Sequence, residues 1–140
     1  MNLTAHLAAQ AEVQPEAPAL IDGDGRACSF AELEARSARA AAQFQSTGGL
    51  TRGDTVLVAQ PFSARLYVVL GGVLRAGLTA MLPDPSADRE RLAECCRQCP
   101  PDALVGPPKA HLLRLLVPAG TGGSIRPAAR GRRRDPAAWP

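Results

Sequence analysis

Three cysteines come closest, in type and spacing, to a reactive or metal-binding motif. Cys95, Cys96 and Cys99 read C-C-x-x-C, and a C-x-x-C pair can be half of a zinc site or a redox pair. The sequence offers neither a second C-x-x-C nor an H-x-x-x-H to complete four zinc ligands. The cysteines follow Leu92 and Ala93 on a predicted helix. We therefore expect packed thiols rather than metal or redox chemistry, and without an export signal we expect all four cysteines to be reduced.

A glycine-rich run has the composition of a phosphate-binding loop. Residues 120–124 read Gly-Thr-Gly-Gly-Ser, and the backbone N–H groups of such a run can cradle phosphate. The run leads into Ile125-Arg126-Pro127 and is followed by no Lys-Gly pair. Because a usable loop links a strand to a second element, we predict that this run does not bind a nucleotide.

The remaining polar candidates each have a structural interpretation. We expect His6 on the surface of the first helix, and Lys109 and His111 in a terminal helix. Asp22 and Asp24 are expected to form a turn, because aspartate side chains hydrogen-bond nearby backbone groups there. Without a nucleophile, base and orienting group in reach of one another, the sequence assigns no catalytic, cofactor-binding or metal-binding residue.

The charge of the chain is unevenly distributed. The 140 residues carry a formal net charge of +3. Residues 118–140 contain five arginines and one aspartate, so they carry +4 and residues 1–117 carry −1. An arginine cluster gives salt-sensitive, non-specific affinity for phosphate. One hypothesis is therefore a small interaction module whose basic tail binds nucleic acid or an acidic partner. Trp139 is the single aromatic residue of the tail, and we expect no specific nucleic-acid partner.

No segment is suited to crossing a membrane. The longest apolar stretch, residues 66–74, has nine residues including two glycines, whereas a bilayer requires roughly 20. The start of the chain lacks the basic and apolar regions of a secretory signal. These features predict a cytoplasmic protein.

The first half of the chain predicts a helix, a hairpin and a second helix. Asn2 can cap a helix with Leu3, Leu7 and Ala11 on one face, which ends near Pro15. A β-hairpin of residues 18–21 and 26–29 follows, around Asp-Gly pairs that suit a tight turn. Residues 29–32, Ser-Phe-Ala-Glu, form a capping box that starts a helix at residue 30, and two glycines at 48–49 end it.

The second half predicts alternating strands and helices. Apolar runs at 55–59, 78–82 and 102–106 predict strands, and the segments 64–76, 86–98 and 109–116 predict helices, with Ser86 as a cap. Gly71 and Gly72 lower helix propensity but permit close approach of another backbone. Alternation of this kind predicts an α/β fold with a parallel sheet. The periodicity stops at Pro118, so we divide the chain into residues 1–117 and a disordered tail, 118–140.

Five short patterns occur in an order that resembles the start of the adenylate-forming superfamily. They are P-x-x-P-A-L at 15–20, S-F-x-E-L at 29–33, G-x-x-x-G-D-x-V at 49–56, L-x-A-G at 74–77 and D-P at 84–85. This superfamily contains acyl-CoA synthetases, luciferases and adenylation domains. Residues 89–92 and 107–114 look like the fatty acyl-CoA ligase branch that includes olefin β-lactone synthetases.

The resemblance implies both a fold and a function. The implied fold is a partial N-terminal subdomain of the adenylate-forming enzyme, a β-hairpin plus alternating βα units. Full-length members are acid–thiol ligases that use ATP and Mg²⁺ to convert a carboxylic or fatty acid into an acyl-adenylate, and usually transfer the acyl group to CoA. The family's phosphate loop, adenine-binding aromatic motif, ribose-binding Asp and catalytic Lys have no match here. The leading hypothesis is a truncated or frame-shifted ligase that is inactive alone. A further hypothesis is that the chain complements the missing remainder, encoded as a separate chain, and so restores a two-chain ligase.

Overall fold

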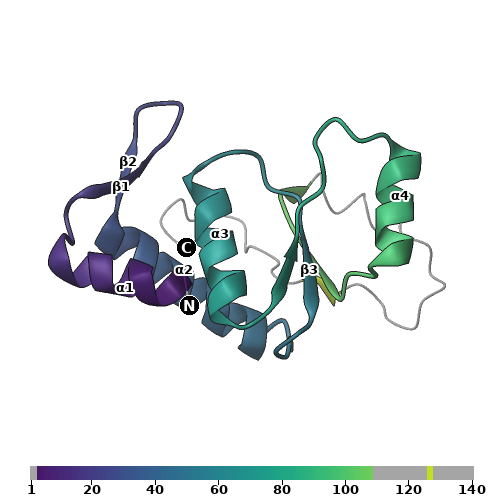
Figure 1. Ribbon diagram of the computed structural model, residues 1–140, viewed down its shortest axis with the longest axis horizontal. Helices are drawn as coiled ribbons and strands as arrows, with labels where there is room; N and C mark the ends of the chain where they lie inside the picture. Colours follow the sequence, from purple (N-terminus) through teal and green to yellow (C-terminus); the bar gives the residue numbers. More distant parts are fainter. Residues whose placement is uncertain (1–2, 109–125, 128–140) are drawn as a thin grey trace.

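The structure is a computed structural model that describes residues 3–108 and 126–127. Helices and strands alternate along most of it (Figure 1). In chain order the elements are α1 Leu3–Val13, β1 Pro18–Ile21, β2 Ala27–Ser29, α2 Phe30–Ser46, β3 Thr55–Val58, α3 Ala64–Arg75, β4 Thr79–Met81, α4 Arg89–Gln98, β5 Ala103–Val105 and β6 Arg126–Pro127.

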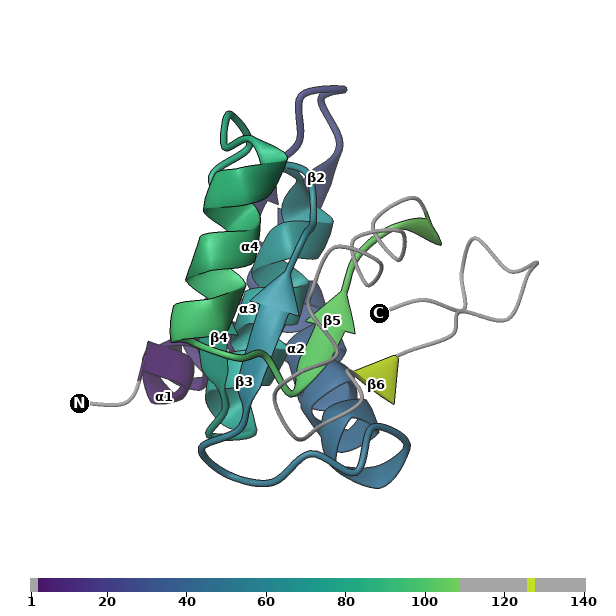
Figure 2. The same ribbon diagram turned by 90° about the vertical axis from the view of Figure 1, so that its right-hand side faces the viewer.

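The predicted parallel sheet is confirmed. Its strand order is β4-β3-β5-β6, and every pair in it is parallel. Val56 at the centre lies opposite Ala80 on one side and Ala103 on the other. Helix α3 covers one face of the sheet and α4 the other (Figures 1 and 2). The predicted hairpin, β1 against β2, forms a separate antiparallel pair.

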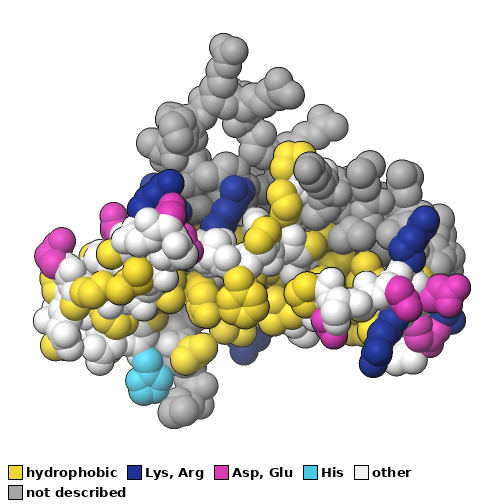
Figure 3. Space-filling model, turned by 90° about the horizontal axis from the view of Figure 1, so that it is seen from above, with side chains coloured by type: hydrophobic (Ala, Val, Ile, Leu, Met, Phe, Trp, Pro, Cys, Tyr) yellow, Lys and Arg dark blue, Asp and Glu magenta, His cyan; other side chains and the backbone are white. Residues whose placement is uncertain are grey.

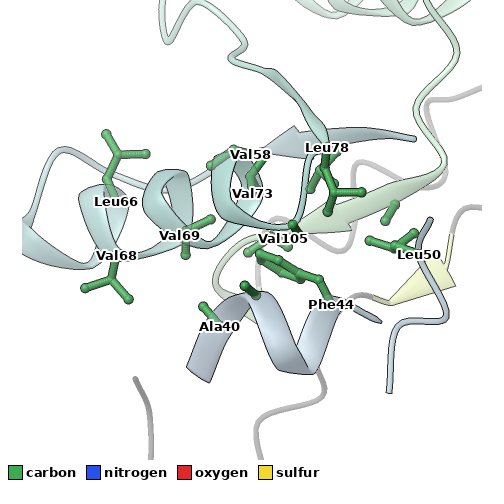
Figure 4. Packing of buried hydrophobic residues seen from close by; sticks show 14 of the residues in the cluster. Ala40, Phe44, Leu50, Val58, Leu66, Val68, Val69, Val73, Leu78 and Val105 are labelled. Atoms are coloured by element: carbon green, nitrogen blue, oxygen red, sulfur yellow. The ribbon is translucent and has the colours of Figure 1, made fainter. Parts of the chain in front are cut away.

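The core lies on both faces of the sheet, because side chains alternate along a strand. Val56 and Val58 of β3 belong to a large cluster with α3 and α2, whereas Leu57 belongs to a smaller cluster with Cys96 of α4. Figure 4 shows Phe44 of α2 pointing towards Val73 of α3 and Val105 of β5. Helix α3 is therefore packed between α2 and the sheet.

The two glycines of α3 lie where α2 approaches it. A Cβ atom built on Gly72 would lie 2.6 Å from the Cβ of Ala40 and 3.1 Å from the backbone N of Ala41, and one on Gly71 would overlap the side chain of Ser37. The predicted close approach is confirmed, and the approaching element is α2.

The capping box and the end of α2 are also confirmed. The Ser29 N–H donates to Glu32 Oε2 (2.9 Å), and the Glu32 N–H donates to Ser29 Oγ (3.2 Å). At the other end the Leu50 N–H donates to the Phe44 carbonyl (3.0 Å), with Gly49 at a left-handed φ of 59°. The free backbone groups that these hydrogen bonds satisfy at the two ends of α2 are thus paired with residues close in sequence.

The packed face of α1 and the cap of α4 differ from the predictions. Leu3 does not share the packed face of α1 but is 68% exposed, and Thr4 is buried instead. A four-residue step advances about 40° beyond a full helical turn, so Leu3 rotates away from the face set by Leu7 and Ala11. Ser86 does not cap α4. Asp88 does so, accepting from the Arg91 N–H (2.8 Å).

The structure describes only part of the C-terminal segment for which we made predictions. The helix predicted at 109–116 lies outside the described residues, as do 118–125 and 128–140 of the predicted tail. Arg126–Pro127 forms β6, with Ala103 opposite Arg126 and Leu104 opposite Pro127. This short strand was not predicted, because two residues carry no periodic pattern of their own.

Candidate functional site

An apolar groove of about 560 Å³ lies at the carboxyl ends of β3 and β4. It is lined by the last residue of β3, Val58, by residues 59–62 after that strand, by three residues of α3 and by three residues after β4. The last two groups are Leu66, Tyr67 and Leu70, and Leu82, Pro83 and Pro85. Ligands of open α/β sheets bind outside the carboxyl ends of the strands, and small-molecule sites fall in the same range of volume. The groove is therefore the candidate site of the described part.

The local sequence explains the shape of the groove. Proline lacks an N–H and cannot continue a central strand, so Pro61 directs the chain away from the sheet after β3. Pro83 follows the edge strand β4. Ser63 is extended, with a φ of −169°, and α3 begins immediately after it. The turn from strand into helix leaves Phe62 85% exposed and Leu82 56% exposed, both lining the groove.

The groove offers little polar chemistry. Gln60 is the one lining residue with an amide side chain, and its Nε2 is buried without a hydrogen-bond partner among the described residues. Among the described residues, no carboxylate lines the groove to hold a metal ion and no cationic side chain lines it to hold a phosphate. The lining is suited to covering apolar surface rather than to catalysis.

Asp84 stands between two lining prolines, but its carboxylate is used within its own turn. The Ser86 N–H (2.8 Å) and the Ser86 Oγ–H (2.7 Å) both donate to Asp84 Oδ1. These hydrogen bonds hold the pKa of Asp84 below its ordinary value. They also explain why Ser86 is not available to cap α4.

Asp22 has a role that the sequence did not predict. It occupies the hairpin turn as predicted, with the Gly25 N–H donating to its carbonyl (2.9 Å). In addition, the Ala64 N–H at the start of α3 donates to Asp22 Oδ1 (2.8 Å). Ser63, the residue at the N-cap position of α3, makes no capping hydrogen bond from its side chain. The hairpin thus caps α3 from 42 residues away in sequence.

The other sequence candidates are placed as follows. Asp24 forms an ion pair with Arg26 (2.9 Å) in the hairpin turn. His6 is exposed on α1, as predicted. Lys109, His111 and the glycine-rich run at 120–124 lie outside the described residues.

The cysteines form no metal centre in the described part of the chain, where no group of three potential ligands comes together. Cys96 is 1% exposed and packs in the cluster of Leu57 and Leu104, so the prediction of a packed thiol is confirmed for it. Cys95 is exposed. Cys99 is exposed and caps α4 rather than lying within it, which corrects its predicted position. Burial raises the pKa of the Cys28 and Cys96 thiols.

Fold and site together define a class: an α/β protein with a parallel sheet between helices and a binding groove at the carboxyl edge. Comparison with known families makes the assignment specific. The chain belongs to the AMP-binding enzyme family, whose model matches residues 7–133. The predicted resemblance to the adenylate-forming superfamily is confirmed.

Two curated relatives illustrate the match. The olefin β-lactone synthetase of Xanthomonas campestris is 34% identical over 89 residues, which are 64% of this chain and 16% of the relative. The long-chain-fatty-acid–CoA ligase of Haemophilus influenzae is 39% identical over 71 residues, 51% of this chain and 12% of the relative. The chain therefore spans less than a fifth of the length of either relative.

Solved structures agree on the fold. The N-terminal subdomain of Klebsiella oxytoca NpsA in complex with 3-hydroxyanthranilyl-AMSN matches with a TM-score of 0.73 at 20% identity, covering 89% of this chain and 29% of that chain. A benzoate CoA ligase from Burkholderia xenovorans matches with a TM-score of 0.72 at 21% identity, covering 83% of this chain and 23% of that chain. The predicted fold, a partial N-terminal subdomain, is confirmed. In the described part, no helix has the length and apolar character needed to cross a membrane.

Proposed function

We propose that this chain supplies the N-terminal portion of an AMP-dependent acyl ligase. Such an enzyme activates a carboxylic or fatty acid with ATP as an acyl-adenylate and transfers the acyl group, usually to CoA. The family match over residues 7–133 carries the proposal. Relatives named as fatty-acid and benzoate CoA ligases support the substrate class.

We further propose that the chain alone does not adenylate. Transition-state stabilisation in phosphate chemistry requires several charged or polar groups aimed at one place. The groove presents apolar side chains and one glutamine, and Asp84 beside it is engaged by Ser86. The described residues therefore do not fit ATP or Mg²⁺. We expect ATP, Mg²⁺ and CoA to be bound by those parts of a full-length relative that this chain does not match.

An ATP–pyrophosphate exchange assay tests this proposal. The purified chain is incubated with ATP, Mg²⁺, labelled pyrophosphate and either fatty or aromatic carboxylic acids, with the Haemophilus influenzae ligase as the positive control. We expect acid-dependent exchange from the ligase and none from the chain. Acid-dependent exchange by the chain itself would show that it holds a complete adenylation site.

The alternative hypothesis, an interaction module with a basic tail, depends on residues 118–140. The structure describes Arg126–Pro127 of this segment, where the backbone pairs with β5. No geometric observation favours nucleic-acid binding over the ligase assignment. The hypothesis therefore stays a prediction from the sequence.

A further inference from the structure

Exposed hydrophobic side chains gather at the groove. The described part exposes seven large hydrophobic residues, and three of them, Phe62, Tyr67 and Leu82, line this one groove. Tyr67 is 43% exposed, which is less than Phe62 and Leu82. Scattered exposed hydrophobic residues are ordinary in soluble proteins, whereas a contiguous patch marks an interaction site.

The chemistry of the groove favours a protein over a small ligand. Small-molecule sites combine an apolar lining with several placed polar groups, whereas Gln60 is the one amide among the described residues that line this groove. Protein interfaces instead combine an apolar, aromatic centre with a polar rim. Figure 3, viewed from above Figure 1, shows hydrophobic side chains running across the middle of this face, with charged side chains around them.

The position of the groove indicates which polypeptide covers it. Strands β3, β4 and β5 are parallel and end at the same edge of the sheet, so the chain leaves β5 from the edge that carries the groove. The matched relatives are far longer, because this chain covers 16% of the Xanthomonas synthetase and 23% of the benzoate ligase. Most of a relative's chain is therefore available to pack on surfaces that this chain leaves exposed.

We propose that the groove is the surface on which a polypeptide carrying the remainder of an adenylate-forming ligase docks. This inference rests on the proposed function and adds the partner and the contact surface. Phe62, Leu82 and Tyr67, the exposed side chains of the groove, supply the apolar contacts.

Co-expression tests the docking surface. The tagged chain is produced together with an untagged Xanthomonas campestris olefin β-lactone synthetase from which the matching 89-residue segment has been deleted. We expect the deleted synthetase to be soluble and to co-purify with the chain. Phe62→Asp should lower the captured amount by at least about tenfold, because it places an unpaired carboxylate in an apolar contact. Leu82→Asp should act in the same direction.

Leu3→Asp is the matched control, since Leu3 is also an exposed apolar residue but lies on α1, outside the groove. It should leave capture unchanged. Thermal unfolding of Phe62→Asp should match that of the unaltered chain, because Phe62 is 85% exposed. If the Phe62→Asp chain does not fold, the test is made with Leu82→Asp.

Several results would overturn the docking inference. They are a deleted synthetase that stays insoluble beside the chain, a soluble one that is not captured, and capture that neither aspartate variant weakens. Self-association of the isolated chain that Phe62→Asp abolishes would assign the groove to a second copy. Capture without ATP–pyrophosphate exchange in the purified complex would instead count against the proposed function and leave the docking surface standing.

Discussion

Single residues determine how closely α2 and α3 pack. Gly72 faces Ala40 and Ala41, and the half-buried pair Arg75–Glu34 joins the same two helices. A glycine inside a helix costs about 1 kcal/mol relative to alanine, so these positions give up helix propensity for contact between α2 and α3. The L-x-A-G pattern at 74–77 ends the helix that carries this contact, and Gly77 adopts a positive φ of 72°.

We expect Gly72→Ala to destabilise the chain by about 1–3 kcal/mol, because the new methyl group meets Ala40 Cβ and the Ala41 backbone in a filled interface. Gly23→Ala is the matched control. A Cβ atom on Gly23 meets nothing within 4 Å, so this change should be close to neutral. Urea unfolding followed by circular dichroism measures both free energies. Equal free energies of unfolding for the two variants would show that α2 and α3 can move apart to admit the methyl group without loss of stability.

Elements are joined by contacts between segments far apart in the chain. The hairpin turn caps α3 through Asp22, and Asp102 before β5 accepts from the Thr55 N–H at the start of β3 (2.8 Å). These hydrogen bonds fix the hairpin beside α3 and the register of the two strands. Because α3 lines the groove, the hairpin contributes to its shape from outside.

We expect Asp22→Ala to lower the free energy of unfolding by about 1 kcal/mol, the usual cost of losing an N-cap acceptor. Asp24→Ala removes an exposed ion pair with Arg26 and an exposed hydrogen bond from the Arg26 N–H (3.1 Å) in the same turn, and should cost less than Asp22→Ala because both contacts are solvent-exposed. Urea unfolding compares the two variants, and amide hydrogen exchange at Ala64 should accelerate in Asp22→Ala alone. An unchanged hydrogen-exchange rate at the Ala64 amide in Asp22→Ala would show that Asp22 does not cap α3.

Local patterns predicted the elements well and their long-range contacts poorly. The capping box of Ser29 and Glu32 and the strands around Val56 depend on neighbours in sequence, so their residues reveal them. The cap from Asp22 to Ala64 joins distant segments, and no local spacing encodes it. The groove was missed for the same reason: Phe62 and Leu82 follow different strands, and the parallel pairing of those strands brings them to one edge.

At the scale of the whole molecule, the described residues form a core but present an apolar groove in place of a set of charged groups. Val58 faces the larger core, while Phe62, four residues later, is exposed. Exposed apolar surface of this kind is typical of a surface that packs against further protein. This surface agrees with the proposed role of the chain as a structural part of an acyl-adenylate-forming ligase.

A chimeric ligase tests this central claim most directly. The 71-residue segment of the Haemophilus influenzae ligase that matches this chain is replaced by the corresponding residues of this chain, and fatty-acid-dependent ATP–pyrophosphate exchange is measured. The ligase with the segment deleted serves as the inactive control. We predict that the chimera folds and retains fatty-acid-dependent exchange. A folded chimera with no more exchange than the deletion control would contradict the assignment.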